Sequence, residues 1–207
     1  MGSLDLLRNG ALDGNPEKVA RVIHLAHQNS LRLATLINDI LDVQRIESGK
    51  MHYVFSKVRL ADCVIESMNS VSGMASTRGI ELALKDVDRE LVVEADQTRL
   101  VQVITNLLSN AIKFSADEPT VDVSVQEHDG RARVTVRDYG IGIPENSEHI
   151  VFDRFSQIDL SDHRKYQGSG LGLSISQSIA EAHSGRVYYQ SAEGRGTSFY
   201  LEIPLIK

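Results

Sequence analysis

A long, nearly heptad pattern between residues 16 and 47 constrains the fold of this chain more than any other feature. Its apolar residues recur at alternating steps of four and three, which predicts a helix with one broad apolar face. The residues of this stripe are Val22, Ala26, Leu33, Leu36, Ile40 and Val43, with Asn29 among them and Ile23, Ser30, Ile37 and Leu41 widening it. Asn15 is suited to cap the start of the helix, Pro16 to its first turn and Gly49 to its end.

A single helix of this kind cannot bury its own apolar face. Residues 3–12 look like the end of a preceding helix, and residues 13–16 form a turn between the two. We therefore read residues 1–49 as a truncated helical hairpin that needs a second helix pair. The simplest source is a second copy of the chain in a four-helix bundle, so a homodimer is expected.

Beyond residue 50 the period changes, and short strands alternate with helices. The expected strands are 53–60, 80–85, 91–94, 121–125, 134–136, 187–190 and 198–203, and the expected helices are 61–75, 96–115 and 171–182. Residues 80–85 and 91–94 flank an acidic turn, and residues 128–130 form a hairpin turn. Residues 50–207 therefore predict an α+β domain, a two-layer sandwich with helices on one face of a largely antiparallel sheet.

Composition narrows the possible partners. A net charge of −6 and a pI of about 5.6 argue against a general binder of nucleic acid or anionic membranes. The single cysteine, Cys63, cannot form an intrachain disulfide, which fits a reducing compartment. We expect its side chain to be buried as a small apolar group. Within the sequence no apolar run approaches membrane-spanning length. We expect a cytoplasmic segment, and a membrane anchor in a longer parent protein stays open.

The helix at 96–115 has an unusual polar face. Its apolar face is formed by Leu100, Ile104, Leu107, Leu108 and Ala111. The opposite face carries Gln102, Asn106, Asn110 and Lys113 at steps of four, four and three. Carboxamide oxygens can ligate a hard cation without adding charge, and a lysine beside them can meet a phosphate. The alternative is an ordinary asparagine-rich surface.

The segment 138–144, Asp-Tyr-Gly-Ile-Gly-Ile-Pro, ends a predicted strand. Asp138 has the same parity as Val134 and Val136, so its carboxylate should point toward the core. There it could accept the amino group of a ligand such as adenine, with glycines nearby that let backbone approach a flat ring. Alternatively, Asp138 merely initiates a tight turn.

Clustered glycines at 168, 170 and 172 directly precede the helix at 171–182. Free N–H groups and the positive end of a helix dipole favour phosphate, although a flexible hinge would look similar. Residues 194–199 form a further hairpin turn. Between these motifs, Phe152 and Phe155 stand in a charged, aperiodic stretch that continues through 161–167. Two exposed phenylalanines would suit a lid or a docking surface, or they could anchor a loop.

The order and spacing of these segments resemble those of the two-component sensor histidine kinases over essentially the whole chain. The N box is similar to 106–114, the G1 box to 138–144, the F box to 152–155, the G2 box to 168–173 and the last glycine box to 194–199. The resemblance implies the Bergerat nucleotide-binding fold, which gyrase-like ATPases and chaperones share. Residues 1–49 resemble the second half of the dimerisation and phosphotransfer hairpin.

This resemblance also implies the roles of individual residues. ATP and Mg²⁺ are the implied ligands, and a response regulator with an aspartate-bearing receiver is the implied partner. Asp138 would receive the adenine amine, Asn110 and secondarily Asn106 would ligate Mg²⁺, and Lys113 would meet phosphate. Arg154 would approach the phosphates or the acceptor helix, which makes Asn106, Lys113 and Arg154 the implied catalytic residues. The remaining implied nucleotide-binding residues are Phe114, Gly140, Gly142, Ile143, Gly168, Ser169, Gly170, Leu171, Gly172 and Thr197.

One family feature is missing from this sequence. The usual phosphoacceptor is a histidine followed by an acidic residue and soon by a Thr-Pro or similar pair, and no such stretch occurs. His24 and His27 lie on the second helix without that context. We therefore expect a chain that binds ATP and phosphorylates a supplied acceptor, but does not autophosphorylate at the usual site. The alternatives are an ATP-hydrolysing clamp, against which the amide at Asn106 argues, and a dimerising scaffold without catalysis.

Overall fold

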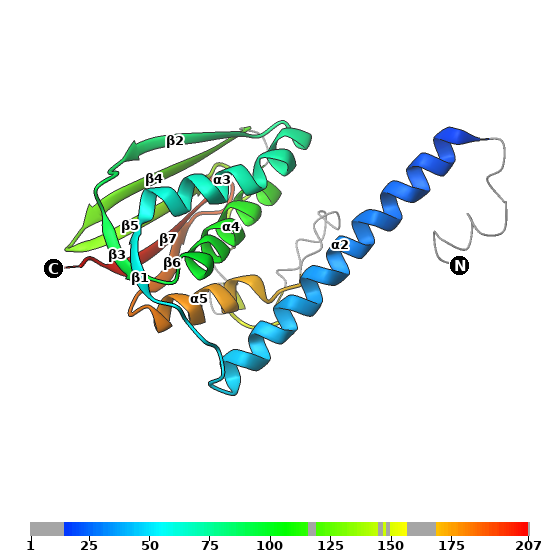
Figure 1. Cartoon of the computed structure of the whole chain (residues 1–207). Coiled ribbons are helices and arrows are strands. Elements are labelled where there is room, and N and C mark those ends of the chain that lie inside the picture. Colours follow the sequence, from blue (N-terminus) through cyan, green and yellow to red (C-terminus); the bar gives the residue numbers. More distant parts are fainter. Residues whose placement is uncertain (1–14, 116–118, 145–146, 148–149, 157–168, 207) are drawn as a thin grey trace.

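The computed structural model describes residues 15–115, 119–144, 147, 150–156 and 169–206. The expected helical stub at 3–12, the stretch 161–167 and Gly168 lie outside the described residues. The described chain consists of one long helix, α2, and a layered domain of helices and strands (Figure 1).

Helix α2 runs from Pro16 to Glu47. The Asn15 side chain accepts a hydrogen bond from the Lys18 N–H at 3.1 Å, which confirms the predicted cap. Most of the predicted apolar stripe is exposed, and only Asp42 and Val43 of this helix are buried. Figure 1 shows why, because most of α2 extends away from the layered domain and only its C-terminal part meets it. Within the described chain nothing covers the remaining apolar face.

The layered domain is built on a five-stranded sheet. Its strand order is β2 (Glu81–Val87), β4 (Thr120–His128), β5 (Arg131–Asp138), β7 (Thr197–Pro204) and β6 (Arg186–Ser191). Every neighbouring pair is antiparallel except β2 and β4, which are parallel. The strands β1 (Ser56–Arg59) and β3 (Val92–Ala95) form a separate antiparallel pair. The expected α+β class with a largely antiparallel sheet is confirmed.

The strands on either side of the acidic turn find their partners elsewhere, since β2 pairs with β4 and β3 pairs with β1. One predicted strand boundary is wrong. The predicted strand at 53–60 shrinks to Ser56–Arg59. At one end Leu60 already begins the next helix, and at the other the Val54 N–H donates to the Asp96 carboxylate at 2.9 Å instead of joining a strand ladder.

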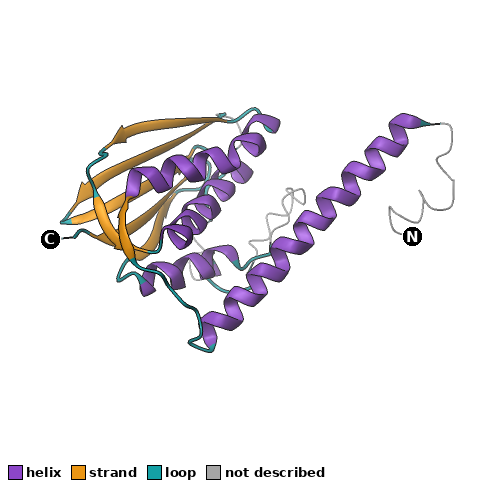
Figure 2. Ribbon diagram, in the orientation of Figure 1, coloured by secondary structure: helices purple, strands orange, loops and turns teal. Residues whose placement is uncertain are grey.

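Three helices cover one face of the five-stranded sheet (Figure 2). They are α3 (Leu60–Thr77), α4 (Gln97–Phe114) and α5 (Gly172–Ala182). The core between the layers holds alternate residues of the central strands and the apolar face of α4, namely Val121, Val123, Val125, Ala132, Val134, Val136, Leu100, Ile104, Leu107, Leu108 and Ala111. Cys63 of α3 is also fully buried, as expected. No helix among the described residues is long and apolar enough to cross a membrane.

Candidate functional site

Asp138 ends β5 with its side chain on the helix-covered face, as its parity predicted, and it is 3% exposed. Its Oδ1 accepts hydrogen bonds from the N–H of Gly140 at 2.9 Å and of Thr197 at 3.2 Å. Burial raises the pKa of Asp138, and these two N–H groups counteract that rise. Both hydrogen bonds within the described residues go to one oxygen, so Oδ2 retains its acceptor capacity toward a ligand donor. The turn interpretation is confirmed, and the ligand interpretation stays a prediction that is compatible with it, since it uses the other oxygen.

Close backbone contacts join the ends of three segments around this carboxylate. A Cβ atom at Gly140 would lie 1.9 Å from the Phe114 carbonyl oxygen, and one at Gly196 would lie 2.1 Å from the Asp138 carbonyl oxygen. Gly142 has a φ of +70°, and a Cβ there would lie 2.2 Å from the Ala192 carbonyl oxygen. These positions admit only glycine without a backbone shift. The predicted motifs at 106–114, 138–144 and 194–199 thus meet at one place.

Ser191, at the end of β6, connects two of these segments. Its Oγ accepts a hydrogen bond from the Ile143 N–H at 2.8 Å, and it lies 3.0 Å from the Gly196 carbonyl oxygen and 2.9 Å from Thr197 Oγ1. This hydroxyl holds the loop after β5 against the hairpin turn before β7. Sequence reasoning missed Ser191, because a serine at a strand end carries no distinctive signal.

The polar face of α4 divides between two neighbouring helices. The Asn106 Nδ2 donates to Ser176 Oγ of α5 at 2.9 Å, and a Cβ at Gly172 would lie 2.3 Å from Asn106 Oδ1. One turn earlier, the Gln102 Nε2 donates to Asp42 of α2 at 2.8 Å. Both carboxamides are half-buried, so this face of α4 is not an ordinary solvated surface.

Asn110 and Lys113 continue the same face toward the end of α4, and both are half-buried. The Lys113 ammonium lies 4.6 Å from the centroid of the Phe114 ring. Burial lowers the pKa of Lys113, and the nearby Arg78 and Arg32 lower it further. A half-buried cation among other cations would gain from an anionic ligand.

The donor set suits a hard cation. Asn106 and Asn110 offer neutral carboxamide oxygens, which are the kind of ligand that Mg²⁺ accepts beside phosphate oxygens. The Asn106 oxygen packs closely against Gly172, where a Cβ atom would lie 2.3 Å from it. Among the described residues, no three His, Cys, Asp or Glu side chains lie together as a metal site.

The entry to α5 lies against the segment that contains Phe152 and Phe155. Gly170 has a φ of +69° and its carbonyl accepts the Phe155 N–H at 2.9 Å. Phe155 is 69% exposed, as expected. The prediction of an exposed Phe152 is wrong, because its ring is half-buried and lies 6.0 Å from that of Tyr189. A strand 37 residues later in the chain provides that cover.

Helix α2 contacts this region through three carboxylates. Asp42 meets Arg99 at 3.3 Å, Glu47 pairs with Arg154, and Asp39 Oδ2 accepts from Ser169 Oγ at 2.8 Å. Arg154 therefore contacts α2, the second helix of the predicted hairpin. Sequence reasoning missed the three acidic partners, although Asp39 and Asp42, three residues apart on one face of the helix, are a signal that could have found two of them.

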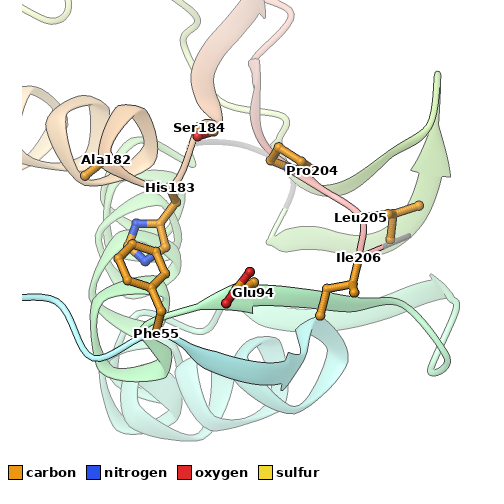
Figure 3. Close-up of a pocket in the computed structure, with 8 residues that line it drawn as sticks. All are labelled: Phe55, Glu94, Ala182, His183, Ser184, Pro204, Leu205 and Ile206. Atoms are coloured by element: carbon orange, nitrogen blue, oxygen red, sulfur yellow. The ribbon is translucent and has the colours of Figure 1, made fainter.

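A pocket lies at the opposite end of the sheet from Asp138 (Figure 3). It has a volume of about 490 Å³ and is lined by Phe55, Glu94, Ala182, His183, Ser184, Pro204, Leu205 and Ile206. None of these is a predicted site residue. The buried His183 accepts the Asp96 N–H on Nε2 at 3.0 Å, so its Nδ1 carries the proton donated to the Ile179 carbonyl at 2.7 Å. This histidine joins α5 to the start of α4 and is structural.

Comparison with known proteins agrees with the geometry. Residues 95–207 match the family described as histidine kinase-, DNA gyrase B-, and HSP90-like ATPase. The chain is 37% identical over 191 residues to the circadian input-output histidine kinase CikA of Synechococcus elongatus. The aligned region covers 91% of this chain and 25% of that protein. It is 32% identical over 208 residues to the sensor histidine kinase WalK of Bacillus subtilis, covering 97% and 33%.

A solved structure has a similar fold. Full-length ShkA, crystallised in complex with AMPPNP, matches with a TM-score of 0.77 at 28% identity over 93% of this chain and 40% of that one. The chain spans a quarter to a third of the length of the two curated relatives. It therefore belongs to the family of histidine kinase-, DNA gyrase B-, and HSP90-like ATPases, and within it to the catalytic regions of the sensor histidine kinases.

Proposed function

We propose that this chain binds ATP with Mg²⁺ and transfers the γ-phosphoryl group to a histidine that another helix supplies. The observation that carries this proposal is Asp138, a buried carboxylate with one oxygen held by two backbone N–H groups and the other left for a ligand. An exocyclic amine such as that of adenine is the matching donor. Gly140 and Gly142 keep the surrounding backbone close and free of side chains.

Charge on the triphosphate would be met along α4 and at the start of α5. Lys113 supplies a cation, and the first N–H groups of α5 supply the positive end of a helix dipole. Mg²⁺ held by the amide oxygens of Asn110 and Asn106 would neutralise phosphate charge. Phe114 would pack beside the adenine, and Ile143, Ser169, Gly170, Leu171, Gly172 and Thr197 would complete the nucleotide contacts, as would Gly168 outside the described residues. In this conformation Arg154 is engaged with Glu47, so its proposed approach to phosphate requires release from α2.

Transfer to an acceptor is favoured over hydrolysis by the chemistry of Asn106. Its amide donates to Ser176 and cannot act as a base toward water. A neutral imidazole is already a nucleophile, so an in-line attack needs positioning and charge neutralisation more than a base. These properties disfavour the alternative of an ATP-hydrolysing clamp.

The exposed apolar stripe of α2 supports the proposed homodimer, because a helix with such a face needs a partner. We further propose a cytoplasmic location, where ATP is available, and a response regulator as the recipient of the phosphoryl group. The acidic net charge of −6 argues against a role in nucleic-acid binding.

A direct test uses calorimetry with ATP and Mg²⁺, followed by mixing with a separate helical hairpin that carries the family's acceptor histidine and with labelled ATP. We expect binding and then label on the hairpin, and both should be lost in Asp138→Asn. Folded protein that does not bind ATP would refute the proposal. ATP binding with no transfer would favour the scaffold alternative, and rapid ATP turnover without acceptor would favour the ATPase.

A further inference from the structure

A hydrogen bond connects α2 to the loop that enters α5. Asp39 Oδ2 accepts from Ser169 Oγ at 2.8 Å, although the two residues lie 130 positions apart. The same hydroxyl oxygen accepts the Leu171 N–H at 3.2 Å. Since the only hydroxyl proton of Ser169 goes to Asp39, its oxygen lone pairs are directed to the backbone of the loop. Asp39 thereby fixes the orientation of Ser169.

This contact matters because, among the described residues, no side chain of α5 caps its own N-terminus. Leu171 is the N-cap residue of α5 and its side chain cannot accept a hydrogen bond. Ser169 satisfies one N–H group at this end, and the Asp39 carboxylate places negative charge near the positive end of the helix dipole. The hydroxyl group that accepts the Leu171 N–H at the start of α5 is therefore oriented by Asp39 of α2, not by a residue of α5.

A second carboxylate of α2 makes separate contacts. Asp42, one turn further along α2, is buried and meets both Arg99 and Gln102 of α4. These contacts hold α2 against the domain but do not involve the loop before α5. Asp39 and Asp42 are thus neighbouring acids with different partners, and they can be separated by substitution.

We propose that Asp39 is a positioning residue for nucleotide binding, acting through Ser169 on the loop whose N–H groups lead into α5. It would make the phosphate-binding end of the site depend on this one side-chain contact with α2. This inference rests on the proposed ATP site, because the start of α5 is the proposed phosphate cradle. It adds a residue from outside the nucleotide-binding domain to the determinants of nucleotide affinity.

The test is a double-mutant cycle between positions 39 and 169, read as the affinity for ATP with Mg²⁺ by calorimetry. Asp39→Ala and Ser169→Ala should each weaken binding about fivefold, the range of one hydrogen bond, and the double variant should bind no more weakly than either. Asp39→Asn keeps an acceptor for Ser169 and should restore most of the affinity. Asp42→Asn, the matched control, removes the same charge from α2 without touching Ser169 and should bind as the parent chain does.

The outcomes separate this inference from the proposed function. If the unsubstituted chain does not bind ATP, the proposed function itself is refuted. If the parent binds, an unchanged or stronger affinity of Asp39→Ala overturns the inference, as do additive effects in the cycle. Equal weakening by Asp42→Asn and Asp39→Ala also overturns it, because the effect would then come from α2 docking in general. Thermal unfolding of each variant identifies any that do not fold. If Asp39→Ala does not fold, the ATP affinity of Asp39→Asn is compared with that of Asp42→Asn.

Discussion

The two ends of the five-stranded sheet hold buried titratable side chains in opposite ways. At one end His183 uses both ring nitrogens, accepting from Asp96 and donating to Ile179, with the rings of Tyr53 and Phe55 packed around it. At the other end Asp138 receives both of its hydrogen bonds on a single oxygen, amid glycines that keep backbone close. A buried polar group whose hydrogen bonds are complete supports the fold, whereas one with capacity remaining is suited to a ligand.

The sharpest way to break this comparison is Asp138→Asn. The amide can keep its oxygen toward Gly140 and Thr197, but it then presents an NH₂ group where the ligand amine also donates. We expect ATP affinity to fall on the order of a thousandfold, about 4 kcal/mol, with the free energy of unfolding nearly unchanged. Calorimetry and urea unfolding of the same sample measure both. A folded variant with parental affinity would show that Asp138 is only a turn residue.

The next largest effect should come from Gly140→Ala. The added Cβ would lie 1.9 Å from the Phe114 carbonyl oxygen, so the backbone must move, and we expect a loss of about 3 kcal/mol in the free energy of unfolding. Gly73→Ala in α3 is the matched control, because nothing lies within 4 Å of its Cβ position. It should be neutral or stabilise the protein by about 0.5–1 kcal/mol. Equal urea midpoints for the two variants would contradict the close approach.

Glu202 on β7 extends the comparison to a buried acid with complete hydrogen bonding. Burial would raise its pKa, but hydrogen bonds from Arg186, Arg133 and Tyr188 lower it from 4.5 to about 2. A lowered folded-state pKa contributes stability that is present above pH 4.5 and is lost as the pH falls toward 2.

For Glu202 we therefore expect about 2 kcal/mol less stability at pH 3 than at pH 7 from this group alone. Urea unfolding at both pH values should show that Glu202→Gln removes this part of the pH dependence. The exposed Glu127→Gln on β4 should leave it intact. The interpretation fails if both variants lose stability in acid to the same extent as the parent chain.

The smallest effect should come from His183→Phe. The ring keeps its volume but leaves the Asp96 N–H and the Ile179 carbonyl without this partner, which costs about 1.5 kcal/mol in the free energy of unfolding. ATP affinity should stay at the parental value, since His183 lies at the opposite end of the sheet. Chemical denaturation and calorimetry test the two halves of this prediction. Weakened ATP binding by a stably folded variant would remove the distinction between the two ends.

Much of the site could be predicted because its signals are local. The parity of Asp138 with Val134 and Val136 correctly placed its carboxylate on the core side, and the 3.6-residue period of α4 correctly put Asn106, Asn110 and Lys113 on one face. The assignment of the glycine turns to one nucleotide site was predicted only from the family resemblance. What could not be predicted were partners distant in the sequence: Asp42 for Gln102, Tyr189 for Phe152, and β1 and β4 for the strands around the acidic turn.

The sequence by itself determined the long helix and its caps, the α+β class and the residues whose chemistry suits a nucleotide. These depend on periodicity, turn chemistry and side-chain type, which act over a few residues. Only the tertiary structure decided that Ser191 joins two loops, that Arg154 pairs with Glu47 of α2 and that Asp39 accepts from Ser169. Each of these contacts joins residues that neither share an element nor follow a common period, so their pairing results from how the layers and α2 pack together.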